Sequence, residues 1–192
     1  MKNQRKANHP INPMILNRWS PRAMTGEPLS DEVIFSLFEA ARWAPSSYNN
    51  QPWRFVYAKR DTSSFQTFVD LLVDFNRQWA PKAALLCVVV ARKTFEKNNK
   101  FSRTHAFDTG AAWENLALEG TSRGLVVHGM EGFDYDKARA VLKIPEDHEV
   151  LAMFAVGKKA PPETLPPDLQ KIEVPSSRKT IEEFMMEGHF RK

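Results

Sequence analysis

The apolar run from Leu85 to Ala91 restricts the possible folds most strongly. All of its residues, LLCVVVA, are apolar and several are β-branched, which is typical of a strand buried on both faces of a sheet. The wider stretch from Ala83 to Ala91 is far shorter than the roughly 20 residues that a membrane-spanning helix needs. The N-terminal sequence MKNQRKANHP contains no apolar segment of the kind found in secretion signals. We therefore expect this strand to lie at the centre of a single domain spanning residues 1–192.

Helical and strand-like patterns surround this run. Ser30 followed by two acidic residues is a helix start, and apolar residues at helical spacing continue until Pro45, which predicts a helix over 30–43. The remaining patterns predict helices over 61–78, 105–123 and 134–142, and strands over 53–58, 125–128 and 149–157. Because helices and strands alternate irregularly, we expect an α+β fold with a mostly antiparallel central sheet flanked by helices.

A proline-rich stretch, 161–167, separates the last predicted strand from the C-terminal segment. The residues that follow, 168–192, are too few to form a core of their own. We expect 161–192 to form an arm that packs on the body of the protein or on another subunit.

The charge is small in total but uneven along the chain. Lysine and arginine number 27 against 23 acidic residues, a formal net charge of +4. The first acid is Glu27, and the positive residues before it are Lys2, Arg5, Lys6, Arg18 and Arg22. Such a cluster favours an anion, which could be nucleic acid, a lipid surface or a cofactor phosphate. A second basic stretch, 92–103, is more typical of a solvated loop.

Several common kinds of site are excluded by what the sequence lacks. The eight glycines form neither the dinucleotide-binding fingerprint nor the phosphate loop of nucleoside triphosphatases. The five histidines are too far apart for a local metal-binding pair, so no metal is expected unless the fold gathers distant ligands. The single cysteine, Cys87, excludes a disulfide within the chain and lies in the apolar run, where we expect it to be inert packing. A reducing, cytoplasmic location fits this composition.

Three segments have the chemistry of a ligand site. The pentapeptide RWSPR at 18–22 offers two guanidinium groups and a hydroxyl for a phosphomonoester. The sequence APSSYNNQPW at 44–53 is a proline-stiffened polar loop that could form the wall of a site for a flat ligand. In GLVVHGMEGFD at 124–134, glycines let backbone N–H groups approach a ligand. Taken singly, each could equally be a surface turn or a connecting loop.

In this order, the three segments resemble the flavin-dependent nitroreductase family, whose members are homodimeric FMN oxidoreductases. Arg178, in the sequence PSSRKTIEEF, also fits the family pattern. The resemblance extends over residues 11–184, and it implies two FMN sites, each built from both subunits. The absent glycine fingerprint agrees with it, because NAD(P)H enters the open flavin site and needs no domain of its own.

The resemblance also implies roles for individual residues. Arg18, Ser20 and Arg178 would hold the phosphate beside Trp19, and Arg22 would face the N1 and C2-carbonyl edge of the flavin. The other implied cofactor contacts are Pro45, Ser46, Ser47 and Asn49 from the opposite subunit, Asn76 at the ring edge, and Gly129, Met130, Glu131 and Gly132 near N5. The family often has a lysine where this chain has Ser176, which implies weaker phosphate binding or a contribution from Lys179.

The implied reaction is a ping-pong hydride transfer from NAD(P)H through FMN to nitroaromatic, quinone or related acceptors. No side chain stands out as an obligatory proton donor. Candidates for the substrate-side wall are Phe101, His105 and Trp113, although each is more typical of core or loop packing.

Two other readings stay open from the sequence. The first keeps FMN but changes the reaction to dehalogenation, ring oxidation or flavin consumption, which usually requires additional lid segments. The second is a non-catalytic flavin sensor or an anion-binding module. A nucleic acid partner is not expected, because the aromatic residues lie mostly in periodic apolar stretches instead of among the arginines. A membrane partner is not expected either, because no apolar run is long enough to cross a bilayer.

Overall fold

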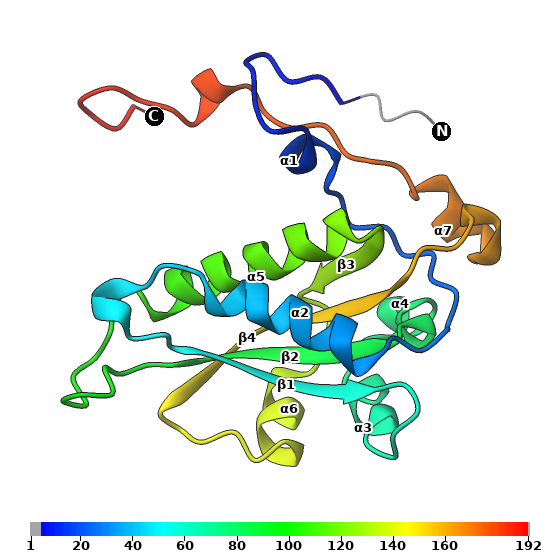
Figure 1. Cartoon of the computed structure of the whole chain (residues 1–192), viewed down its shortest axis with the longest axis horizontal. Coiled ribbons are helices and arrows are strands. Elements are labelled where there is room, and N and C mark those ends of the chain that lie inside the picture. The colour runs from blue at the N-terminus through cyan, green and yellow to red at the C-terminus, as the bar shows by residue number, and fades with distance from the viewer. Residues whose placement is uncertain (1–4, 192) are drawn as a thin grey trace.

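The structure is a computed structural model that describes residues 5–191, so Lys2 of the basic N-terminal cluster lies outside the described residues. A four-stranded sheet with the order β1-β2-β4-β3 forms its centre (Figure 1). The strands are β1 (Trp53–Lys59), β2 (Leu85–Arg92), β3 (Leu125–Met130) and β4 (His148–Lys158). All three pairings are antiparallel, which confirms the predicted α+β fold with an antiparallel sheet.

Strand β2 occupies the interior position that its sequence predicts. It pairs with β1 on one side and with β4 on the other. Its side chains alternate between two hydrophobic clusters: Leu85, Cys87 and Val89 belong to one, and Leu86, Val88 and Val90 to the other. Because both faces of the strand are covered, an uninterrupted apolar run is what this position requires.

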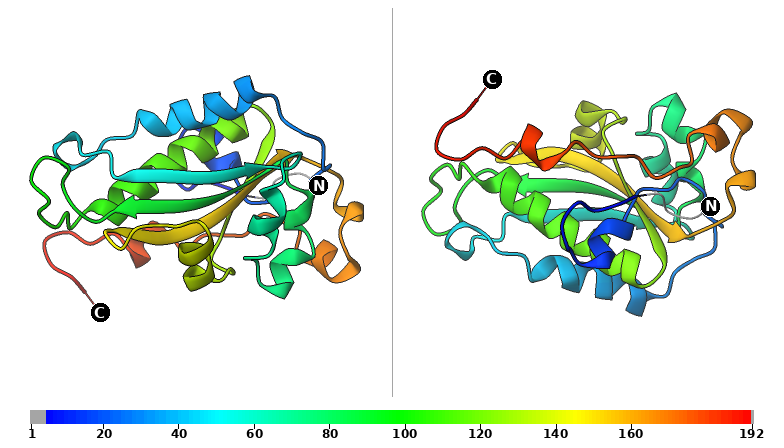
Figure 2. Two further views of the ribbon diagram at one scale, coloured as in Figure 1. Left: turned by 90° about the horizontal axis from the view of Figure 1, so that it is seen from below. Right: turned by 90° about the horizontal axis from the view of Figure 1, so that it is seen from above.

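Helices cover both faces of the sheet (Figures 1 and 2). On one face lie α2 (Asp31–Arg42) and α5 (His105–Ser122), and on the other α3 (Phe65–Val69) and α6 (Tyr135–Val141). The shorter elements are α1 (Pro13–Asn17), α4 (Asp74–Arg77), α7 (Pro167–Lys171) and the 3-10 turns η1 (Ser47–Asn49), η2 (Ala80–Lys82), η3 (Pro162–Thr164) and η4 (Ile181–Glu183). The predicted helices 30–43, 105–123 and 134–142 are confirmed within one or two residues.

The ends of the two long helices show why the sequence predicts them well. The Ser30 hydroxyl accepts a hydrogen bond from the N–H of Val33 and so caps α2. After the end of α5, Gly124 adopts a φ of +71°, a left-handed conformation that favours glycine. Both signals are local, and both agree with the helical spacing of the buried residues between them.

The single helix predicted over 61–78 is wrong, because the chain forms α3, an extended step and then α4. At the step, Val73 has a ψ of 159° and its N–H donates to the carbonyl oxygen of Gly132. The neighbouring Leu72 forms an isolated antiparallel bridge with Phe133. Pairing with a segment about sixty positions away therefore overrides the local helical spacing.

Strand β3 is longer than predicted, and it includes both Gly129 and Met130. Gly129 lies opposite Phe154 of β4, so it is a strand residue instead of part of a loop. A Cβ atom at this position would lie 3.0 Å from Cζ2 of Trp113 on α5. The glycine therefore allows α5 to pack closely on the sheet, and the connecting loop begins only at Glu131.

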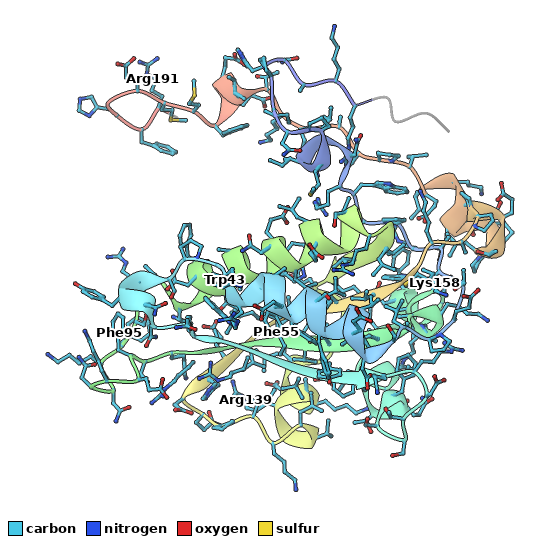
Figure 3. The ribbon with its side chains drawn as sticks, viewed as in Figure 1. Trp43, Phe55, Phe95, Arg139, Lys158 and Arg191 are labelled. Carbon is cyan, nitrogen blue, oxygen red and sulfur yellow. The ribbon has the colours of Figure 1, made fainter. Side chains whose placement is uncertain are left out.

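Beyond α7 the chain continues as an arm on the side of α5 that faces away from the sheet (Figure 1). The N-terminal segment lies on the same side, and the arm ends at the projecting Arg191 (Figure 3). Phe184 and Phe190 on the arm are 65% and 85% exposed. Packing of this arm on another subunit stays a prediction.

Candidate functional site

A cavity of about 260 Å³ lies between the segment 18–22, strand β3 and the beginning of the arm. Its lining consists of Arg5, Arg18, Trp19, Ser20, Arg22, His128, Ile172, Val174, Ser176 and Arg178. The fold therefore brings together the two sequence segments that contain the predicted phosphate-binding arginines. None of the lining residues is acidic, so the cavity is suited to an anion.

Arg5 is the residue that joins the two walls of this cavity. Its guanidinium donates to the carbonyl oxygen of Arg18 at 2.6 Å and to that of Ser176 at 2.9 Å. Burial lowers the pKa of Arg5, and the positive charges of Arg178 and Arg18 lower it further. The crowding of three guanidinium groups destabilises added positive charge and favours a bound anion.

Arg18 and Arg178 lie on opposite walls of the cavity, and each is directed by a neighbouring group. Arg18 lies 3.4 Å from the Ser20 hydroxyl and 3.5 Å from the carboxylate of Glu114 on α5. Arg178 donates to the Ser176 hydroxyl at 2.8 Å. Ser176, which stands where a lysine was expected, thus orients an arginine, whereas Lys179 does not line the cavity.

The buried carboxylate of Glu173 holds Arg22 in place. The backbone N–H of Arg22 donates to Oε1 of Glu173 at 2.6 Å, and the guanidinium lies 3.7 Å from Oε2. The Nε atom of Arg22 is buried and has no hydrogen-bond partner among the described residues. The described part of the protein therefore leaves this donor without an acceptor.

His128 on β3 forms part of the cavity floor. Its Nδ1 donates to the carbonyl oxygen of Pro21 at 2.8 Å, and its ring lies against Trp79 with the ring centroids 4.4 Å apart. Burial lowers the pKa of His128 to about 4, with smaller contributions from Arg22 and Arg18. The imidazole is therefore neutral at neutral pH, and it fixes the position of the segment 18–22.

The loop 44–53 does not line this cavity, although it contains Pro45, Ser46, Ser47 and Asn49. It is anchored to α5, because the N–H of Ser47 donates to the carboxylate of Asp108 at 3.0 Å. Asp108 and Glu114 are six positions apart, which places them roughly 120° apart around the helix. The loop and Arg18 consequently contact different faces of α5 within one chain.

The loop is held by several hydrogen bonds, and it exposes Pro45, Tyr48 and Asn49. Tyr48, Asn49 and Gln51 have positive φ angles, a conformation that the surrounding bonds must hold in place. The N–H of Gln51 donates to the Ser46 hydroxyl at 3.0 Å, and the side chain of Asn50 bonds both to Thr94 and to Glu96. Figure 3 places Phe95 on the adjoining hairpin, where its ring meets that of Tyr48 edge-on.

Asn76 lies beside Gly132, as expected if both contact the same ligand. The Asn76 side chain is already hydrogen-bonded within the protein. Its amide nitrogen donates to the carbonyl oxygen of Gly132 at 2.9 Å, and its oxygen accepts from the indole N–H of Trp79 at 3.2 Å. Among the described residues, the backbone N–H groups of Glu131 and Gly132 make no hydrogen bond. The loop after β3 thus presents two free donors, with Met130 buried behind them.

The three residues named for a substrate-side wall differ in exposure. Phe101 is 65% exposed and meets the ring of His105 edge-on, whereas His105 is buried and hydrogen-bonds to Ser102 and Glu149. Trp113 is half-buried against Gly129. His105 is therefore a packing residue within one chain, and Phe101 alone of the three presents a largely free side chain.

Other chemistry receives no support from the part of the chain that the structure describes. Cys87 is fully buried, and burial raises the pKa of its thiol well above the usual value, so it is inert packing as predicted. Residues 5–191 contain no cluster of three or more metal-ligating side chains. The helices described here are also too short or too polar to cross a membrane.

Sequence reasoning missed three residues of this site. The sequence indicates Arg5 only as part of a basic cluster, and it indicates no role for His128 or Glu173. Arg5 could have been found from the absence of the expected lysine at Ser176, which leaves a position for another cation. Glu173 carries no local signal, because its partners lie about 150 positions away.

Comparison with known proteins gives a consistent result. The model of the nitroreductase family matches residues 15–64 and 59–158 of this chain. DrgA, a protein of Synechocystis sp., is 30% identical over 157 residues, covering 68% of this chain and 75% of its own. A protein of Archaeoglobus fulgidus that carries the provisional name NADH dehydrogenase/NAD(P)H nitroreductase is 29% identical, covering 75% of this chain and 82% of its own.

Among solved structures, the crystal structure of an oxidoreductase containing FMN superposes with a TM-score of 0.94. It is 40% identical and covers 100% of this chain and 98% of its own. A nitroreductase family protein from Streptococcus pneumoniae has the same fold, with a TM-score of 0.72 at 20% identity over 91% of this chain and 98% of its own.

Proposed function

This chain belongs to the nitroreductase family, and from that premise we propose that it is an NAD(P)H-dependent FMN oxidoreductase that reduces nitroaromatic, quinone or related electrophilic acceptors. The observation that carries the proposal is the arginine cavity, in which Arg18, Arg22 and Arg178 converge without an acidic neighbour in the lining. This is the cation arrangement that a phosphomonoester with a polar ring system needs.

The residues of the cavity fit FMN in two respects. The guanidinium groups of Arg5, Arg18 and Arg178 supply more positive charge than nearby acids neutralise, and the Ser20 hydroxyl adds a donor. The unpaired Nε of Arg22 is a buried donor that the protein leaves without an acceptor. A buried donor without a partner is costly, and a carbonyl or ring nitrogen of the flavin would remove that cost.

We assign the phosphate to Arg18, Ser20 and Arg178, with Trp19 alongside. Arg5 takes the place of the lysine that is absent at Ser176, because it brings a guanidinium to the same cavity and bonds to the Ser176 carbonyl oxygen. Serine in place of lysine at position 176 then lowers the affinity for FMN less than the loss of one positive charge would suggest.

FMN, when bound, would supply the hydride chemistry that connects NAD(P)H with the acceptor. Arg22 would face the N1 and C2-carbonyl edge of the ring and would stabilise negative charge there. The free N–H groups of Glu131 and Gly132 would serve as hydrogen-bond donors toward N5, and Asn76 has one remaining N–H that could reach the ring edge.

A second copy of the chain completes each site in this proposal. The loop with Pro45, Ser46, Ser47 and Asn49 contacts a different face of α5 from Arg18, so it reaches a flavin only across a subunit interface. Large apolar side chains are available for such an interface: Trp43 at the end of α2 is 71% exposed and Phe107 on α5 is 80% exposed. Two exposed aromatic residues on the arm add to this surface.

The test is the colour of the purified protein under argon. We expect a yellow protein that bleaches with NADH or NADPH and regains its colour with nitrofurazone or a quinone. Colour that does not bleach would support the flavin sensor, and a colourless protein that takes up no added FMN would exclude both flavin functions.

A further inference from the structure

Glu173 is a buried carboxylate at the point where the C-terminal arm leaves the body. The residue is 3% exposed. Its Oε1 accepts hydrogen bonds from the backbone N–H groups of Arg22, at 2.6 Å, and Ala23, at 2.9 Å. Its other oxygen, Oε2, is buried without a hydrogen-bond partner among the described residues.

Anchoring of the arm explains why position 173 needs a hydrogen-bond acceptor, but it does not explain why the side chain is charged. An amide oxygen would accept the same two backbone N–H groups, so anchoring needs an acceptor but no charge. Removing a carboxylate from water is costly unless a close partner compensates for it. The partner here is the Arg22 guanidinium at 3.7 Å, which is longer than a good charged hydrogen bond. The negative charge of Glu173 therefore calls for another explanation.

The position of Arg22 supplies that explanation. Its guanidinium lines the arginine cavity, with its Cζ 5.8 Å from the centre of the Phe75 ring. Glu173 does not line the cavity, so it lies behind Arg22 as seen from a ligand. Arg22 and Glu173 carry opposite charges, and in a partly buried setting solvent screens them only weakly. A ligand in the cavity therefore experiences the positive field of Arg22 reduced by the negative field of Glu173.

We propose that Glu173 is a positioning residue that fixes Arg22 and moderates its positive charge, and thereby sets the reduction potential of bound FMN. The inference rests on the proposed function, because it requires FMN in the arginine cavity. Reduction places negative charge next to Arg22, so the negative charge of Glu173 lowers the potential. Loss of that charge at an unchanged position of Arg22 raises it.

Glu173→Gln tests this inference, because the glutamine keeps an acceptor for both backbone N–H groups and replaces the charged carboxylate with a neutral amide. The readout is the ratio of reduced to oxidised flavin in the loaded protein at one fixed solution potential, set by a redox dye. We expect the ratio to rise about tenfold, since a charge within a few ångströms of Arg22 acts through a medium far less polar than water. Glu163→Gln is the matched control, being an exposed glutamate in the same C-terminal region, and should change the ratio less than about twofold.

A double-variant comparison tests whether the effect comes from the charge of Glu173. Because the fields of separate charges add, Glu173→Gln should raise the ratio in the Arg22→Met background as well as in the wild type. An unchanged ratio in the single variant overturns the inference, and so does a fall of the ratio when the glutamine is introduced into the Arg22→Met background.

Glu173→Asp covers the case in which the glutamine variant fails to fold. Its carboxylate lies one methylene farther from Arg22, so we expect the ratio to rise in the same direction by about threefold, and an unchanged ratio overturns the inference. A wild-type protein that binds no FMN overturns the proposed function and this inference with it. If the wild type binds FMN but the variants show the same ratio of reduced to oxidised flavin, only this inference is overturned.

Discussion

The guanidinium of Arg5 donates a 2.6 Å hydrogen bond to the carbonyl oxygen of Arg18. A second bond from Arg5 reaches Ser176, which is 171 positions away in the sequence. One side chain thus holds the N-terminal motif and the C-terminal arm at a single cavity. This relationship explains how arginines from both ends of the chain come to face the same space.

We therefore predict that Arg5→Met weakens FMN binding by about tenfold or more, because it removes a cation and loosens both walls. Titration of the apoprotein with FMN, followed by the quenching of flavin fluorescence, measures this. Lys6→Met is the control, since Lys6 is exposed and does not line the cavity. Equal affinities for the two variants would contradict the assignment of Arg5 to the site.

Arg18 and Arg22 should differ in their effects. Arg18→Ala removes a phosphate ligand, so we expect mainly a loss of FMN affinity. Arg22→Ala should retain substantial flavin and lower its reduction potential, because the positive charge at the N1 edge is lost. Affinity and potential measured on both variants check this division, and equal changes in potential would refute it.

His128 predicts a pH dependence of stability. Its pKa is about 4 in the folded protein and 6.5 as a free side chain, so the unfolded chain binds more protons between these values. Stability is complete above pH 6.5 and declines as the pH falls toward 4, by up to roughly 3 kcal/mol. Urea unfolding of the apoprotein across this range measures the effect. His128→Gln should flatten the decline and the exposed His189→Gln should not, so parallel curves for all three proteins would count against this origin.

Gly132 predicts a steric effect beside the flavin-facing loop. A Cβ at this position would lie 2.7 Å from Nδ2 of Asn76 and 2.9 Å from Cγ2 of Val73. We expect Gly132→Ala to lower the free energy of unfolding by about 1–3 kcal/mol. At Gly110 in α5 nothing lies within 4 Å of the added atom, so Gly110→Ala should leave stability unchanged or raise it by up to about 1 kcal/mol. Similar losses at both glycines would show that crowding is not the cause.

The elements that could be predicted from the sequence are those whose signals are local. Strand β2 is recognised from its own apolar run, and α2 from the cap at Ser30 and the stop at Pro45. The interval between α3 and α4 could not be predicted, because Leu72 and Val73 leave the helix to pair with residues near Gly132. Helical spacing on both sides of the interruption hides a bond made to a distant segment.

The residues of the candidate site also fall into those that the sequence predicts and those that it does not. Arg18, Ser20, Arg22 and Arg178 lie in short segments whose chemistry is visible in the sequence, and the structure places all four at one cavity. The role of Glu173 could not be predicted, because nothing in the sequence around this glutamate indicates that the fold places it behind Arg22. Long-range placement, and not residue type, decides which charges act on the cavity.

Sedimentation of the purified protein, recorded both in the flavin band and in the protein band, tests the central claim most directly. We predict that the flavin absorbance moves with a species of twice the 22.0 kDa chain mass, at one flavin per chain. Flavin bound to a species of single-chain mass, or a protein boundary without flavin absorbance after incubation with FMN, would contradict a cofactor held between two copies of this chain.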